Sequence, residues 1–256
     1  MIRIGCILLF FYCLKGLANV VDLTHAFDEK TIYWPTEKGF QKKVVFKGTT
    51  SGGYFYSAYK FCMPEHGGTH MDAPVHFSRN GLSVSQIPAK ELIGHALVID
   101  LSKKINCKAD YRISVFDIQQ FEKKYRVIRS GDLVFFYTGW SRFWKNKKMY
   151  MGSAQFGDVK HLHFPGISKE AARYLVQKKV RAVGIDTASL DEGQSLDFQA
   201  HRILLGANVY GVENLRNLDK LPAMGALVIA APLKIKGGSG APVRVLAIFG
   251  ESLSMI

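Results

Sequence analysis

Apolar residues along this chain gather in short runs interrupted by turns, which is the pattern of buried strands. The runs at 96–101 (ALVIDL) and 133–138 (LVFFYT) are continuous rather than alternating, as expected for strands covered on both faces. A shorter run at 182–185 ends at Asp186. Further strands are predicted at 20–24, 42–47, 54–61, 226–235 and 243–249, the last two as a hairpin around Gly237-Gly238-Ser239-Gly240.

Two helices are predicted between these strands. Ser114 is followed three residues later by Asp117, the spacing of a capping box, so a helix should begin there and run to about Tyr125. A second helix should span 169–179, because Pro165-Gly166 forms a turn before it. This order of elements predicts the α/β class. No repeat, low-complexity tract or linker divides the chain after residue 18, so we expect one domain over residues 19–256.

The first 18 residues are expected to be a cleavable signal peptide rather than part of the fold. Arg3 precedes an apolar run from Ile4 to Leu14, and Gly16 and Ala18 are small residues suited to a cleavage site. This run of 11 residues is short for a bilayer span, although an uncleaved anchor is the alternative. We therefore expect a secreted or periplasmic protein without a stable membrane anchor.

The overall composition is that of an ordinary globular protein. The chain has 256 residues, 48% of them hydrophobic and 21% charged, which argues against a disordered or coiled-coil chain. Its formal net charge of +13 makes a basic nucleic-acid-binding protein one alternative. However, the basic residues are spread over unrelated elements without a recognised motif, and we expect no nucleic-acid partner. After cleavage Cys62 and Cys107 would remain, either paired or as free thiols.

Residues 65–77 (EHGGTHMDAPVHF) hold the most chemically informative cluster of the chain. Four of its side chains are metal-ligand types: His66, His70, Asp72 and His76. On an extended chain the last three face the same side, because side chains alternate with period two. A turn at Gly67-Gly68 would fold His66 back toward His70. This set of imidazoles with one carboxylate predicts a site for zinc, manganese or iron.

A second set of ligand-type side chains lies downstream. Its members, which no local periodicity connects, are Asp186, Asp191, His201 and Glu213. Asp186 ends a predicted strand, which is where sites collect in α/β folds. Aromatic residues that could form the floor of a pocket for a planar substrate are Tyr33, Trp34, Phe164 and Trp140.

The segment 66–76 (HGGTHMDAPVH) resembles the signature H-x-G-T-H-x-D-x-P-x-H of the metal-dependent cyclase family, which includes bacterial kynurenine formamidases and isatin hydrolases. The resemblance covers nearly the whole chain after residue 18. Its other parts are Asp22-Leu23-Thr24, Trp34-Pro35, Phe164-Pro165-Gly166, Gly184-Ile185-Asp186-Thr187, Ser189-Leu190-Asp191, Ala200-His201, Val212-Glu213-Asn214 and Ala241-Pro242-Val243-Arg244.

The resemblance implies a metal centre, a fold and an assembly. It implies that His66, His70 and Asp72 hold one divalent ion, zinc or manganese, and that Asp72 bridges to a second ion bound by His201 and Glu213. It also implies a mixed β/α fold of the swivelling type and a homodimer with pockets completed near the subunit interface. One departure is visible, since Ser239-Gly240-Ala241-Pro242 stands where formamidases often carry Asp-Gly-Ser-Pro.

Together these features predict an exported metal-dependent amidohydrolase that cleaves an aryl formamide or a cyclic aryl amide such as isatin. N-formylkynurenine, an intermediate of tryptophan catabolism, is the leading single substrate. Water activated by the ion would attack the amide carbonyl, and His76 would serve as general base and then acid. Tyr33, Trp34 and Phe164 would contact the substrate. The alternative from another class is a non-catalytic metal- or ligand-binding module on the same fold.

Overall fold

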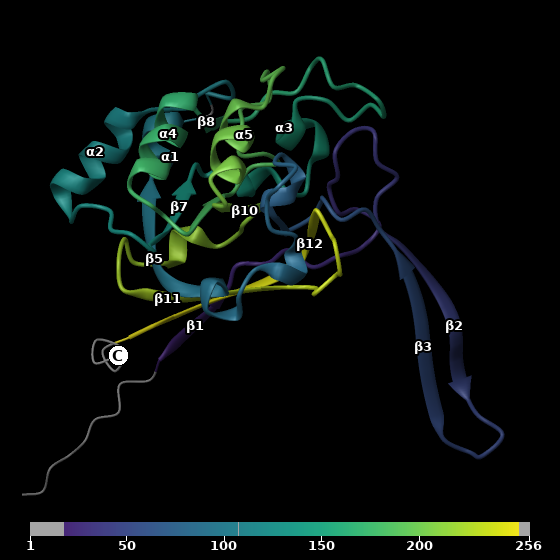
Figure 1. Ribbon diagram of the computed structural model, residues 1–256. Helices are drawn as coiled ribbons and strands as arrows, with labels where there is room; N and C mark the ends of the chain where they lie inside the picture. Colours follow the sequence, from purple (N-terminus) through teal and green to yellow (C-terminus); the bar gives the residue numbers. More distant parts are fainter. Residues whose placement is uncertain (1–17, 107, 251–256) are drawn as a thin grey trace, which may run out of the picture.

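The computed structural model describes residues 18–106 and 108–250 (Figure 1). Except for Ala18, the predicted signal peptide lies outside the described residues, and so does Cys107. Cys62 is exposed and its thiol is free. Among the described residues, no helix has the length and apolar character needed to cross a membrane.

An eight-stranded sheet forms the body of the protein, with the order β1-β12-β11-β5-β7-β9-β10-β4. A further pairing between β4 and β12 closes the sheet into a barrel-like ring, to which β1 is added at β12. The strands span Asn19–Asp22 (β1), His70–Asp72 (β4), Ile93–Asp100 (β5), Leu133–Tyr137 (β7), Ala182–Ile185 (β9), Tyr210–Glu213 (β10), Ala226–Pro232 (β11) and Gly240–Phe249 (β12). The β5-β7-β9-β10 pairings are parallel, and the other pairings are antiparallel.

Helices cover one side of this sheet, as Figure 1 shows for α2, α4 and α5. Their bounds are Ser102–Ile105 (α1), Val115–Lys124 (α2), Lys147–Met151 (α3), Lys169–Gln177 (α4) and Gln199–Gly206 (α5). A small parallel pair, β6 (Arg112–Ile113) and β8 (Gly166–Ile167), lies beside them. These elements give the mixed α/β domain that the sequence predicts.

The central strands are buried on both faces, as their continuous apolar runs predict. In β5, Leu97 and Ile99 belong to the cluster under the helices, whereas Ala96 and Val98 belong to the second cluster. In β7, Phe136 likewise belongs to the cluster under the helices and Phe135 to the second cluster. The sheet therefore has a hydrophobic core on each side, and the edge where β4, β10 and β12 meet is held between the two.

Both predicted helices are confirmed, with Ser114 as the N-cap of α2 and Ser168 as the N-cap of α4. The strand hairpin β11–β12 is confirmed as well. Helix α5 was not predicted, because Phe198 at its N-cap has a left-handed backbone and forms no side-chain cap. The extended conformation expected through His76 was wrong: the chain is extended only to Ala73, and Pro74 then opens the 3-10 helix η1 (Pro74–His76).

A long β-hairpin projects away from the domain (Figure 1). It consists of β2 (Gln41–Thr49) and β3 (Phe55–Cys62), which pair with each other and with no other strand of the part of the chain that the structure describes. Nearly all of its residues are exposed. Its large exposed hydrophobic residues are Val44, Val45, Phe46, Tyr54, Phe55, Tyr56, Tyr59 and Phe61. A two-stranded ribbon with apolar residues on both faces has little to stabilise it in water on its own.

The capping box of α2 yields a stability prediction. The buried Asp117 carboxylate accepts hydrogen bonds from the Ser114 backbone N–H and hydroxyl and from Tyr111 Oη, and it pairs with Lys104. Burial opposes its ionisation, but these partners outweigh burial and lower its pKa. A lowered pKa stabilises the fold above the unfolded-state pKa, and this contribution is lost as pH falls through the folded-state pKa.

We therefore expect Asp117→Asn to lower the free energy of unfolding by about 1 to 2 kcal/mol at neutral pH. In urea denaturation, the difference from the unsubstituted protein should shrink as the pH is taken into the acid range. Asp110→Asn is the control, because Asp110 is half-exposed and its ion pair among the described residues is with half-exposed His163. An equal loss of stability at all pH values would contradict an ionised Asp117.

Candidate metal centre

The register of the closing strand β4 brings the candidate ligands together. His70 lies opposite Glu213 of β10, and Asp72 lies opposite Gly211 of β10 and Gly240 of β12. Because alternate residues of a strand share a face, His70 and Asp72 point to the same side, where Glu213 joins them. The sheet closure thus places ligands from sequence positions 143 residues apart side by side, since 213 − 70 = 143.

Three buried groups form the inner part of the cluster. His70 Nε2 lies 3.3 Å from Asp72 Oδ1 and 3.4 Å from Glu213 Oε2. One ligand atom from each of these residues lies within 4.8 Å of the others, which is a spacing suited to one ion. This arrangement brings residues of both predicted ligand sets into one cluster.

His201 reaches the same carboxylates from α5. Its Nε2 lies 3.3 Å from Asp72 Oδ2 and 3.1 Å from Glu213 Oε1, while its Nδ1 lies 2.6 Å from Asp191 Oδ2. Asp191 also accepts hydrogen bonds from the backbone N–H groups of Ala200 and His201, so its carboxylate is fixed at the start of the helix. A carboxylate on the far nitrogen of a ligating imidazole orients the ring and increases its basicity.

His66 and His76 form the outer part of the cluster. His66 Nδ1 lies 2.6 Å from Asp72 Oδ1, and the His76 ring stacks on the His66 ring with 3.8 Å between centroids. His66, Asp72 and His76 also offer three ligand atoms within 4.8 Å. The geometry therefore divides the candidate ligands differently from the resemblance, since His76 joins His66 whereas His70 joins Glu213. Asp72 belongs to both groups.

A hydrogen-bond relay fixes which nitrogen His66 offers. Glu65 Oε2 accepts from the Ser239 backbone N–H at 2.9 Å and from Ser239 Oγ at 2.6 Å. Ser239 Oγ lies 2.9 Å from His66 Nε2. Since the single hydroxyl proton of Ser239 is donated to Glu65, the His66 Nε2–H must donate to Ser239 Oγ. His66 is therefore left with Nδ1, the atom beside Asp72, as its ligand atom.

His70 is oriented in a similar way. Its Nδ1 donates to the backbone oxygen of Gly68 at 2.9 Å, which leaves Nε2 facing Asp72 and Glu213. The Gly68 backbone oxygen also accepts a hydrogen bond from Asn214 Nδ2. The backbone oxygen of Asn214 in turn accepts one from Thr69 Oγ1. These two bonds connect the loop before β4 to Asn214, the residue after β10, and so fix the backbone on both sides of the ligands.

Glycine is required at two positions beside the ligands. At Gly67, where φ is +147°, a Cβ would lie 2.0 Å from the Tyr33 ring. At Gly240 a Cβ would lie 2.4 Å from Cε1 of His66. Such distances are far inside van der Waals contact, so only glycine lets the backbone approach the pocket wall and the His66 ring this closely.

The charges of the cluster are strongly coupled. Burial opposes ionisation of Asp72, but the charge of His70 and hydrogen bonds from three imidazoles hold its pKa well below the ordinary value. Burial would lower the pKa of His70, yet Asp72 and Glu213 raise it to about 9. Burial likewise opposes charging of His201, but Asp191, Asp72 and Glu213 raise its pKa well above the ordinary value. Burial, followed by the Asp72 charge, raises the pKa of Glu213.

The raised pKa values of His70 and His201 favour positive charge on these rings, which compensates the buried Asp72 carboxylate. A divalent cation would supply the same charge and leave the imidazoles neutral, as ligands must be. The cluster fits a metal ion of the zinc, manganese or iron type. Its nitrogen and oxygen donors converge and are mostly buried, and hydrogen bonds to the second ring nitrogens orient the imidazoles. The donor set alone does not select among these ions.

A cavity of about 300 Å³ opens onto the ligands, which is the size of a small-molecule pocket. Of the predicted substrate contacts, Tyr33 and Trp34 line it. Phe164 was placed wrongly: it is fully buried in a separate core cluster with Trp140 and Tyr150, and it does not line this cavity. Aromatic character alone does not distinguish core residues from pocket residues.

Two further aromatic residues, Phe77 and Phe198, line the cavity and were missed. Phe77 follows His76 directly, so its position next to the motif was the available signal. Asp186, in the second predicted set, is not a ligand: its carboxylate accepts from Thr138 N–H and Oγ1 and from Ser141 N–H. It joins the ends of β7 and β9, and burial raises its pKa.

Comparison with known proteins confirms the resemblance seen in the motif. The family model described as "Putative cyclase" matches residues 21–192. The isatin hydrolase of Roseibium aggregatum is 33% identical over 250 residues, which cover 92% of this chain and 93% of that protein. The kynurenine formamidase of Bacillus cytotoxicus is 26% identical over 226 residues, which cover 88% of this chain and 95% of that protein.

A solved structure shares the fold as well as the sequence. Isatin hydrolase A from Ralstonia solanacearum matches with a TM-score of 0.83 at 33% identity, and the match covers 91% of this chain and 92% of that chain. The solved structure of this similar protein therefore confirms the predicted mixed β/α fold.

The relay to His66 yields a prediction about metal affinity. Ser239→Ala and Glu65→Gln should each weaken divalent metal binding about 10- to 100-fold. The first removes the acceptor of the His66 Nε2 proton, and the second removes the carboxylate that orients the Ser239 hydroxyl. Competition against a metal-binding dye measures this affinity without any substrate.

The double variant Ser239→Asp with Glu65→Ala should recover most of the affinity, since it returns a carboxylate directly to His66 Nε2. Glu170→Gln, on the exposed surface of α4, is the control. Full affinity in both single variants would contradict the relay.

Proposed function

This chain belongs to the cyclase family, and on that basis we propose that it is a metal-dependent hydrolase that cleaves the carbon–nitrogen bond of an aryl amide. The observation that carries the proposal is the buried cluster of His70, Asp72, His201 and Glu213 at the base of a cavity with an aromatic lining. A structural metal site would be closed by its ligands, whereas this cluster opens onto a cavity that can hold a small molecule.

The chemistry follows from where the residues lie. His70, Asp72, His201 and Glu213 would hold a divalent ion, which when bound would supply a nucleophilic water at neutral pH and polarise the amide carbonyl. Trp34, Phe77 and Phe198 line the cavity and would hold a planar aromatic ring against the ligands. Asp191 and the Glu65–Ser239 pair hold His201 and His66 in place during the reaction.

His76 is the proposed proton carrier. Its side chain lies exposed at the cavity edge, stacked on His66 and 6.2 Å between ring centroids from His201. Desolvation among these packed rings is the largest influence and lowers the pKa of His76 to about 4, against the opposing effect of Asp72. His76 is therefore neutral at physiological pH, and a ring nitrogen with a free lone pair can accept a proton from the attacking water and return it to the leaving nitrogen.

Two substrate classes are proposed, cyclic aryl amides such as isatin and aryl formamides such as N-formylkynurenine. The first class is favoured by the higher identity with isatin hydrolase than with kynurenine formamidase. The second class is favoured by Glu213, which lies with His70 and Asp72 in one candidate group and 3.1 Å from His201, as the resemblance implies for a two-ion formamidase centre. Either product is a carboxylate.

A hydrolysis panel on the metal-loaded protein tests the function. We expect turnover of isatin or of N-formylkynurenine, and loss of that turnover when a chelator removes the ion. His76→Ala should lower kcat about 100-fold or more, the typical effect of removing a general base, while the bound metal remains at the unsubstituted level by elemental analysis.

His161→Ala is the matched control, because His161 is an exposed histidine on the surface. Loss of metal together with activity in His76→Ala would assign His76 as a ligand instead. Absence of turnover on lactams, formamides and activated esters, with metal still bound, would leave the non-catalytic metal-binding module.

We propose further that residues 1–18 direct export and are removed. The support is the pattern of Arg3, the apolar run and the small residues at 16 and 18. The exported protein should begin near Asn19 by N-terminal sequencing, and an intact Met1 would contradict cleavage.

The proposed homodimer draws its support from the projecting hairpin. Phe55, Tyr59 and Phe61 alternate along one face of β3, and each is at least 40% exposed. An apolar surface of this kind on an isolated ribbon marks a protein–protein contact. A second copy of the chain is the partner that the family resemblance implies.

Phe55→Asp combined with Phe61→Asp should convert the dimer to a monomer in sedimentation velocity, because two charges would enter the buried face. Phe156→Asp, which changes an exposed loop phenylalanine, is the control and should leave the dimer intact. A monomeric unsubstituted protein, or an unchanged dimer in the double variant, would contradict the proposal.

A further inference from the structure

A second and larger cavity, of about 1180 Å³, lies beside the metal-ligand cavity. The two cavities share Ile32, Tyr33 and Glu37 as a wall, but none of the metal-ligand candidates lines the second one. Its lining carries many charged side chains alongside the aromatic residues Tyr33, Tyr137 and Trp144. We propose that it binds a small organic carboxylate at its cationic end, a site separate from the metal centre.

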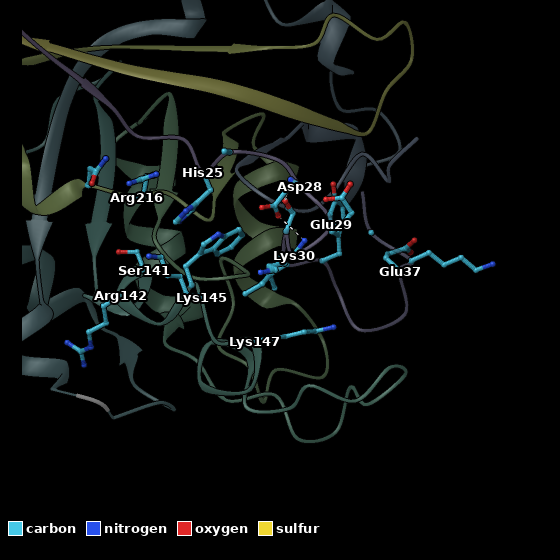
Figure 2. Close-up of a pocket in the computed structure, with 18 of the residues that line it drawn as sticks. His25, Asp28, Glu29, Lys30, Glu37, Ser141, Arg142, Lys145, Lys147 and Arg216 are labelled. Atoms are coloured by element: carbon cyan, nitrogen blue, oxygen red, sulfur yellow. Dashed lines mark hydrogen bonds between the residues drawn. The ribbon is translucent and has the colours of Figure 1, made fainter. Parts of the chain in front are cut away.

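The cationic end is visible in Figure 2, where His25, Arg216 and Lys145 lie toward one side and Asp28 and Glu37 toward the other. Arg216 is held beside His25 by its backbone, since its N–H donates to the Leu23 oxygen at 3.1 Å. Arg216 and Lys145 form no ion pair within residues 18–106 and 108–250. Two cationic groups without an acidic partner are thus available for an anion.

His25 provides the second observation that points to a ligand. Only 6% of it is exposed, and its ring stacks on Trp144 with 3.9 Å between centroids and 14° between planes. Its Nε2 is buried and has no hydrogen-bond partner among the described residues. A buried polar atom left without a partner is costly, so such atoms in native proteins are normally satisfied by water or by a ligand.

Neutral His25 suits a ligand that accepts a hydrogen bond. Burial, and then the nearby Arg216 charge, lower its pKa to about 3, so the ring is neutral and can donate one N–H. A carboxylate can accept from this N–H with one oxygen while Arg216 and Lys145 pair with its charge. The acidic residues Asp28, Glu29, Glu37 and Asp219 in the same lining argue against a polyanion, because it would meet them elsewhere in the cavity.

Isothermal titration of the full chain with benzoate tests the site, with benzamide as the neutral analogue of the same shape. Benzoate should bind, and benzamide should bind about tenfold more weakly or not at all. Arg216→Gln and Lys145→Gln should each weaken benzoate binding about tenfold, the usual effect of losing one charge-assisted contact. His25→Phe should weaken it as well, although it keeps a ring stacked on Trp144.

Lys169→Gln, an exposed lysine on α4, is the matched control and should bind benzoate normally. His70→Ala tests whether benzoate sits on the metal centre instead. Binding lost in His70→Ala but unchanged in Arg216→Gln and Lys145→Gln would overturn the proposal, as would equal binding of benzamide. Phosphate competing as well as benzoate would show a general anion site and overturn carboxylate selectivity. None of these outcomes depends on whether the chain hydrolyses amides.

Discussion

The closure of the sheet through β4 is the constraint on which the site depends. This strand has three residues, His70 to Asp72, and it pairs on one side with β10 and on the other with β12. Both neighbours then deliver groups to its polar face: Glu213 from β10, and Gly240, which admits the His66 ring, from β12. The ligand geometry is thus a consequence of strand register rather than of a flexible loop, and the two cores on either side of the sheet fix that register.

The sequence predicted what is local. The 66–76 motif places its ligands within a few residues of one another, and continuous apolar runs are enough to identify strands buried on both faces. The relay from Glu65 to His66 runs through Ser239, which is 173 residues from His66, and no local pattern connects such partners. The extended chain predicted through His76 did not anticipate η1, because proline at a first helical position favours the short 3-10 turn that carries His76. Phe164 failed as a pocket residue because hydrophobic burial and substrate contact select the same residue type.

The departure at Ser239 now has a structural reading. In this chain Ser239 offers a hydroxyl whose proton is taken by Glu65, so two residues together hold the Nε2–H of His66. Because Glu65 also accepts from the Ser239 and Gly240 backbone, the pair fastens the beginning of β12 to the motif. Ligand orientation and sheet closure are therefore served by the same hydrogen bonds.

The shortness of β4 has a consequence for the life of the protein before it acquires metal. A three-residue strand contributes few ladder bonds, and it carries Asp72 and faces Glu213, two carboxylates that must be neutralised in a buried setting. We call the pairing of β4 with β10 and β12 the seam of the barrel. The stability of this seam therefore depends on a positive charge that neutralises the two carboxylates. A divalent ion bound there would neutralise both carboxylates, so ion binding and the stability of this seam would be coupled.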